Sequence, residues 1–75
     1  MPKLPLISGE KAIRTLEKLG FNKVRQKGSH VILKKKLPNE EIGCVVPLHS
    51  ELATGTLKGI LRQSRLTLEE FNEYL

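Results

Sequence analysis

The stretch that decides the fold runs from residue 21 to residue 47 and reads FNKVRQK-GS-HVILKKK-LPNE-EIGCVV-P. Its middle run is rich in β-branched and apolar residues, which favour a strand. Gly28-Ser29 is typical of a turn, and Pro47 ends the third run because proline has no amide proton to donate to a ladder. The connections are short, so the sequence predicts an antiparallel meander of three strands, at residues 21–27, 30–36 and 41–46.

Helical patterns flank this stretch. Ser8 is a good N-cap for a helix over residues 8–19, whose apolar residues recur at helical spacing before Gly20 ends it. Glu10 and Arg14 are four residues apart and are expected to pair on the outer side of this helix.

Two further helices are predicted after the strands. One begins near Gly55-Thr56, with Thr56 as its cap and an apolar stripe that follows at Leu57, Ile60 and Leu61. The segment Thr67-Leu68-Glu69-Glu70 has the form of a capping box and predicts a short final helix.

The predicted order is therefore one helix, three strands and two helices, which is an α+β fold. Helices are expected to cover the apolar face of the sheet and to leave the opposite face to solvent or a ligand. The α-β-β-β-α part of this order resembles the double-stranded-RNA-binding fold. A chain of 75 residues fits one domain over residues 1–75.

The charge pattern points to a polyanionic partner. The formal net charge is +5, from 13 Lys+Arg against 8 Asp+Glu. Between Lys18 and Asn39 there are six cations and no carboxylate: Lys23, Arg25, Lys27, Lys34, Lys35 and Lys36. This favours nucleic acid as the partner. The alternative is a solvated, lysine-rich hairpin that keeps a small protein in solution.

Several classes of protein and site are not expected. The single cysteine, Cys44, allows no internal disulfide and is interpreted as a buried, inert thiol. The segment Met1–Pro5 is too short and too proline-rich for a secretory signal, and no apolar stretch is long enough for a membrane span, so a cytoplasmic location is expected. Paired cysteines, clustered carboxylates and a glycine-rich phosphate loop are all missing, so no metal or cofactor is expected.

The two histidines are the candidates for proton transfer. Strand alternation puts His30, Ile32 and Lys34 on one face and Val31 and Leu33 on the other. If the second set meets the helices, an imidazole and an ammonium face outward together, which suits attack on a phosphodiester. Lone histidines more often have a surface or core role.

His49 follows the third strand and has three possible roles. It is a second proton-transfer group, a phosphate contact near the start of the following helix, or a loop histidine bonded to backbone. Its spacing alone favours the last role.

Four stretches resemble the HicA toxins, the ribonuclease halves of HicA–HicB toxin–antitoxin pairs. They are, in chain order, LEKLGF (16–21), KGSH (27–30), VPLH (46–49) and GTLKGILRQ (55–63). The resemblance implies a double-stranded-RNA-binding-like fold, cleavage of mRNA and neutralisation by a HicB-type antitoxin. It also implies that His30 is catalytic and that Gly28 and Ser29 shape the turn that presents it.

The resulting hypothesis is a metal-independent endoribonuclease that uses His30 and requires no cofactor. The expected RNA-binding residues are Lys23, Arg25, Lys27, Gly28, Ser29, Lys34, Lys35 and His49. The expected partners are mRNA and a HicB-type antitoxin, with DNA reached only through the antitoxin. The alternatives are a non-catalytic RNA-binding module of the same fold and a domain that binds only proteins.

Overall fold

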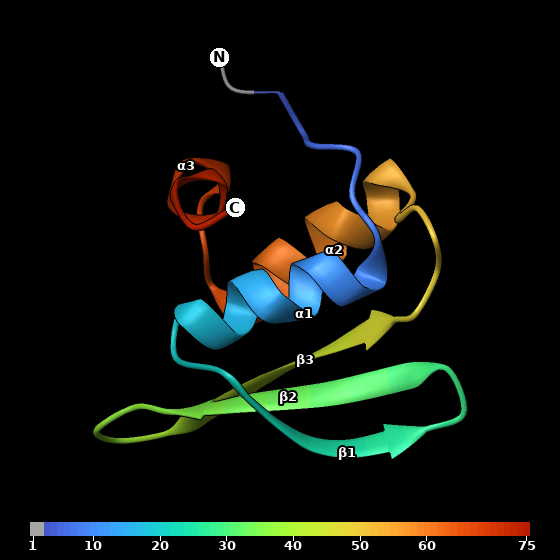
Figure 1. Cartoon of the computed structure of the whole chain (residues 1–75). Helices are drawn as coiled ribbons and strands as arrows, with labels where there is room; N and C mark the ends of the chain where they lie inside the picture. Colours follow the sequence, from blue (N-terminus) through green and yellow to red (C-terminus); the bar gives the residue numbers. More distant parts are fainter. Residues whose placement is uncertain (1–2) are drawn as a thin grey trace.

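The computed structural model describes residues 3–75, so the first two residues of the segment Met1–Pro5 lie outside it. The chain forms an α+β fold, as the sequence predicts (Figure 1). Its elements, in chain order, are α1 (Gly9–Lys18), β1 (Asn22–Lys27), β2 (His30–Lys36), β3 (Glu41–Pro47), α2 (Thr54–Ser64) and α3 (Leu68–Glu73).

The sheet is the predicted antiparallel meander, with strand order β1-β2-β3. His30 lies opposite Lys27 on β1 and opposite Pro47 on β3. The register shifts between Lys23 and Arg25, so β1 carries a bulge at Val24. Lys23 pairs with the inward residue Leu33, whereas Arg25 pairs with the outward residue Ile32. The bulge therefore sends these two cations to opposite faces of the sheet, although an unbroken strand would place them on the same face.

The core lies between the inner face of the sheet and the helices. α1 packs against β1 and β3, and α2 packs against β3 (Figure 1). Phe21 and Phe71 belong to this core. The strands contribute Val31, Leu33, Ile42, Cys44 and Val46. Every residue of β1 is exposed, whereas β2 and β3 each contribute buried residues to the core.

Two of the three helices begin at a residue whose side chain caps the helix. Ser8 caps α1 by accepting a hydrogen bond from the Lys11 amide at 3.0 Å. The capping box of α3 forms as predicted, with Thr67 and Glu70 exchanging bonds of 2.9 and 3.1 Å. The sequence therefore identifies both of these starts correctly.

The prediction that Thr56 caps α2 is wrong. The helix begins at Thr54, and its N-cap, Ala53, makes no capping bond through its side chain. Leu52 is buried, and its amide donates to the Ile7 carbonyl oxygen at 2.8 Å. This tertiary anchor sets the start of α2 two residues before Thr56, so Thr56 lies within the first turn.

None of the helices within residues 3–75 has the length and apolar character needed to cross a membrane.

Candidate functional site

The outer face of the sheet gathers the predicted imidazole and three cations. Val31 and Leu33 are buried, while His30 and Lys34 are exposed on the opposite side of β2. This confirms the expectation that His30 and Lys34 face outward together. The register adds Lys27 directly across from His30, and Arg25 across from Ile32 on the same face.

These cations differ in how far they are already paired. The Lys34 ammonium lies 3.6 Å from a carboxylate oxygen of Glu41, and both side chains are about half exposed. Exposed pairs of this kind contribute roughly 0–1 kcal/mol, so a phosphate can compete with the carboxylate. Arg25 and Lys27 have no ion-pair partner among residues 3–75.

The turn before His30 is held on both sides. Gly28 has a φ of +60°, a left-handed value that glycine adopts without strain. Its carbonyl oxygen accepts a hydrogen bond from the Gln26 side chain at 3.1 Å. The Ser29 carbonyl accepts one from the Leu48 amide at 2.7 Å. The histidine is therefore presented from a turn that is braced against the loop after β3.

This loop, residues 48–53, is in turn fixed to the start of α1. The Gly9 amide donates to the His49 carbonyl oxygen at 2.9 Å. A Cβ atom on Gly9 would collide with the Pro47 carbonyl oxygen and lie 3.1 Å from the Leu48 Cα. Only glycine at position 9 lets the Pro47 carbonyl come this close to α1. The first turn of α1 thereby supports the loop that is bonded to the turn before His30.

His49 is held through its backbone rather than its ring. Its carbonyl accepts the bond from Gly9, and its side chain is exposed. The part of the chain that the structure describes contains no hydrogen bond from the His49 imidazole. The ring is therefore available to a ligand at the end of β3.

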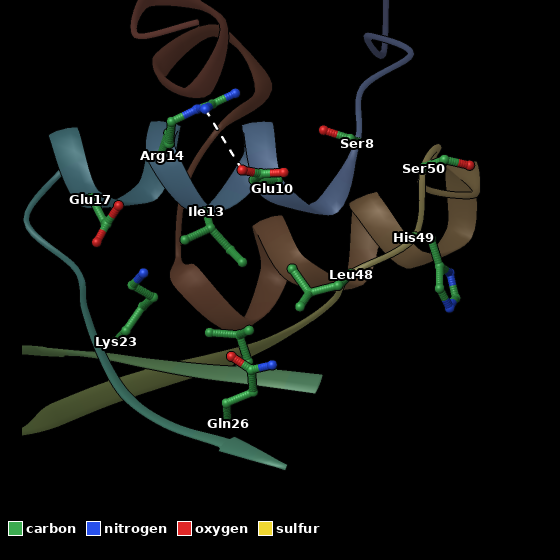
Figure 2. A pocket seen from close by; sticks show the side chains of 11 residues that line it. Ser8, Glu10, Ile13, Arg14, Glu17, Lys23, Gln26, Leu48, His49 and Ser50 are labelled. Atoms are coloured by element: carbon green, nitrogen blue, oxygen red, sulfur yellow. Dashed lines mark ion pairs between the residues drawn. The ribbon is translucent and has the colours of Figure 1, made fainter. Parts of the chain in front are cut away.

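Lys23 does not lie with the outer cations. It points into a groove of about 620 Å³ between α1 and β1, on the helix side of the sheet (Figure 2). Gln26 joins it from β1, and Glu10, Arg14 and Glu17 line the opposite wall. Glu10 and Arg14 pair at 3.9 Å, as their spacing predicts.

Lys35 also lies apart from the outer face. It alternates with Val31 and Leu33 on the inner side of β2, and its ammonium donates to the Leu19 carbonyl oxygen at 2.9 Å. The same group sits 5.8 Å from the centre of the Phe21 ring, over the junction between α1 and β1. The Lys35 ammonium caps a carbonyl at the end of α1 and lies near the Phe21 ring, so it already has partners within the protein.

The remaining reactive groups show no second site. Burial raises the pKa of the Cys44 thiol, and the neighbouring Ser64 hydroxyl opposes this only in part. A buried thiol with a raised pKa is a poor nucleophile. Within residues 3–75, no three His, Cys, Asp or Glu side chains lie close enough together to hold a metal ion.

Comparison with known families matches residues 9–66 to the HicA toxins of bacterial toxin–antitoxin systems. The chain belongs to the HicA toxin family. The match covers every element from α1 to the end of α2. HicA toxins generally cleave mRNA, and membership of a toxin–antitoxin family implies an antitoxin partner. No individual curated protein matches the chain.

Two contributors to this HicA site are absent from the predicted set. Gly9 supports the loop, and its signal is a glycine directly after the N-cap, where a side chain is ordinarily tolerated. The bulge at Val24 places Lys23 and Arg25 on opposite faces of the sheet. The only sequence feature that indicates it is the loose alternation of residues 21–27, which is a weak signal.

Proposed function

We propose that this HicA toxin is a metal-independent endoribonuclease that cleaves mRNA with His30 as its general base. The observation that carries the proposal is the exposed His30 on the sheet face that also holds Arg25, Lys27 and Lys34. An imidazole transfers protons near neutral pH, and fixed positive charge stabilises a phosphate that gains negative charge in the transition state.

The cleavage step uses the 2′-hydroxyl of the RNA itself. His30 removes the 2′-hydroxyl proton, and the 2′ oxygen attacks the adjacent phosphorus. The bond from phosphorus to the 5′ oxygen breaks, and this oxygen takes a proton from water or from His49. The products are a 2′,3′-cyclic phosphate and a 5′-hydroxyl. Lys27, directly across the hairpin from His30, stabilises the charge that develops on the phosphoryl oxygens.

RNA binding is assigned to the outer face. Arg25, Lys27 and Lys34 contact phosphates, and the Gly28-Ser29 turn places the backbone beside His30. Lys23 points into the groove and Lys35 is bonded to Leu19, so neither belongs to this set. Phosphate contacts of this kind carry little sequence preference and weaken with salt.

Replacement of His30 tests the proposal. His30→Ala and His30→Gln are each expected to lower the cleavage rate by about 10²- to 10⁴-fold, because the proton acceptor is lost while the exposed strand end stays folded. The measurement is cleavage of an end-labelled RNA, with Lys18→Ala as the control for loss of a distant exposed residue. A matched substrate with a 2′-deoxyribose at the cleaved position should survive, and EDTA should have no effect.

Three outcomes would contradict this scheme. Equal cleavage rates for the wild type and His30→Ala would show that His30 is not the general base. Complete loss of cleavage in EDTA would contradict the metal-independent step. RNA binding by the wild type without any cleavage would favour the alternative of a non-catalytic RNA-binding module.

We infer that the antitoxin partner is of the HicB type and that its binding keeps RNA away from His30. The basic hairpin suits a partner with acidic groups, and binding would stabilise a small fold by mass action. A co-purification from cells that express both genes of the operon tests this inference, and a toxin that emerges without an antitoxin would contradict it.

A further inference from the structure

The groove between α1 and β1 lies on the helix side of the sheet, apart from His30 and the cations of the outer face. Figure 2 shows it with Glu17 and Arg14 on the helix, Lys23 and Gln26 on the strand, and Leu48 and His49 at one end. We propose that this groove docks a segment of the partner antitoxin. The segment would carry an apolar side chain for the floor, with an acidic and a basic residue beside it.

The floor of the groove is apolar. Ile13 and Val31 are almost fully buried beneath it, and Leu48 remains 39 % exposed. The Leu48 amide donates to the Ser29 carbonyl oxygen, so the backbone that carries this exposed side chain is anchored. A partner's apolar side chain packed against Leu48 would therefore bury apolar surface with little ordering cost in the toxin.

The groove carries charges of both signs. Glu10, Arg14 and Glu17 lie on the α1 wall, where Glu10 pairs with Arg14, and Lys23 lies on the β1 wall. No ion pair crosses the groove among the described residues. In Figure 2 the Glu17 and Lys23 side chains point toward one another, from α1 and β1 respectively.

This pattern fits a protein and not RNA. A polypeptide segment can place a cation beside Glu17 and a carboxylate beside Lys23, so both walls gain an opposite charge. A nucleic acid strand brings only phosphates, which could pair with Lys23 or Arg14 but would leave Glu17 facing a like charge and would compete with Glu10 for Arg14. The outer face, in contrast, offers Arg25 and Lys27 with no carboxylate partner within residues 3–75.

The groove also lies where a docked segment can control the cleavage site. Val31 follows His30 directly, and Leu48 is bonded to the turn that precedes His30. A partner anchored in the groove can thus extend over the His30 turn without using the phosphate-binding cations as its anchor. Docking on Leu48 and Glu17 and cleavage by His30 then depend on different residues and can be separated by mutation.

The experiment compares two exposed aliphatic side chains of similar exposure on opposite faces. Leu48, 39 % exposed, lines the groove, and Val45, 41 % exposed, lies on the outer face of β3. Binding of the purified HicB-type antitoxin of the same operon would be measured by calorimetry. Leu48→Ala is expected to raise the dissociation constant by about tenfold or more, and Val45→Ala by less than about threefold.

A charge reversal gives a second variant that leaves the floor intact. Glu17 is exposed, so Glu17→Lys should fold normally, and thermal unfolding would verify this for each variant. It is expected to weaken antitoxin binding by about tenfold, because a cation of the partner would face a lysine. Glu69→Lys, at an exposed position of α3, is the matched control and should leave the dissociation constant unchanged.

RNA cleavage is measured on the same variants, because the docking proposal rests on the proposed function only for the identity of its partner. Leu48→Ala and Glu17→Lys should both cleave RNA at the wild-type rate. If the wild type cleaves no RNA but Leu48→Ala still loses antitoxin binding, the ribonuclease proposal fails and the docking site stands.

Two results would overturn the docking site. If Val45→Ala weakens antitoxin binding and Leu48→Ala does not, the antitoxin is anchored on the outer face of the sheet instead. If Glu17→Lys tightens RNA binding and leaves antitoxin binding unchanged, the groove holds RNA.

Discussion

Gly9 shows how one residue far from His30 in sequence supports its position. The amide of Gly9 bonds to the loop after β3, and the absent side chain lets the Pro47 carbonyl approach the helix. That loop then bonds to Ser29, directly before the histidine. The chain of contacts thus runs from the start of α1, through the loop after β3, to the turn that precedes His30.

Gly9→Ala is therefore expected to destabilise the fold. Alanine in a helix is ordinarily favoured over glycine by about 1 kcal/mol, but here the added methyl group would displace the backbone of Pro47 and Leu48. We expect a net loss of about 1–3 kcal/mol in the free energy of unfolding, measured by urea denaturation. Gly55→Ala is the control, because a Cβ there would meet nothing within 4 Å. A Gly9→Ala variant as stable as Gly55→Ala would contradict this account.

At the scale of elements, the end of α2 is tied to the loop between β2 and β3 by a two-pronged ion pair. The Arg65 guanidinium donates to both carboxylate oxygens of Glu40, at 2.7 and 2.8 Å. Arg65 adopts a left-handed φ of 56° where the helix ends. The hydrogen bonds from Arg65 and its charge hold the pKa of Glu40 below its ordinary value of 4.5.

This pair predicts a specific acid sensitivity. A carboxyl whose folded-state pKa is depressed adds stability above its unfolded pKa and loses it as the pH falls through the folded value. The wild type should therefore lose more stability than Glu40→Gln when the pH falls from above 4.5 to below it. Thermal unfolding at a series of pH values measures this difference, with Glu69→Gln as the control. Identical pH profiles for wild type and Glu40→Gln would show that the pair contributes nothing.

The elements also show which parts of the fold can be predicted from sequence. The type and order of every element can be predicted, with α1 and α2 given by apolar periodicity and α3 by its capping box. The strand β2 has the predicted bounds because its apolar, β-branched run lies between the Gly28-Ser29 turn and the loop that begins at Leu37. The bulge at Val24 and the start of α2 at Thr54 depend on contacts between distant segments, which no local pattern records. The position of Lys35 on the inner face did have a local signal, since it alternates with Val31 and Leu33.

At the scale of the whole molecule, charge is divided between two sides of the fold. Arg25, Lys27 and Lys34 lie on the outer face of the sheet, while the acidic residues of α3 lie on the helix side (Figure 1). A polyanion is therefore attracted to the outer face and repelled by α3, which under the proposed function favours the approach of RNA to His30.

This division predicts the salt dependence of RNA binding. Each phosphate contact to a single strand contributes about −0.7 to the slope of log affinity against log salt, so three cations give a slope near −2. Lys27→Ala should reduce the magnitude of the slope by about 0.7, measured by fluorescence anisotropy with a His30→Ala background to prevent cleavage. Lys18→Ala is the control, because this lysine bonds to the Tyr74 carbonyl oxygen on the helix side. If Lys18→Ala changed the slope as much as Lys27→Ala, RNA would bind the helices and the outer face would not be the RNA site.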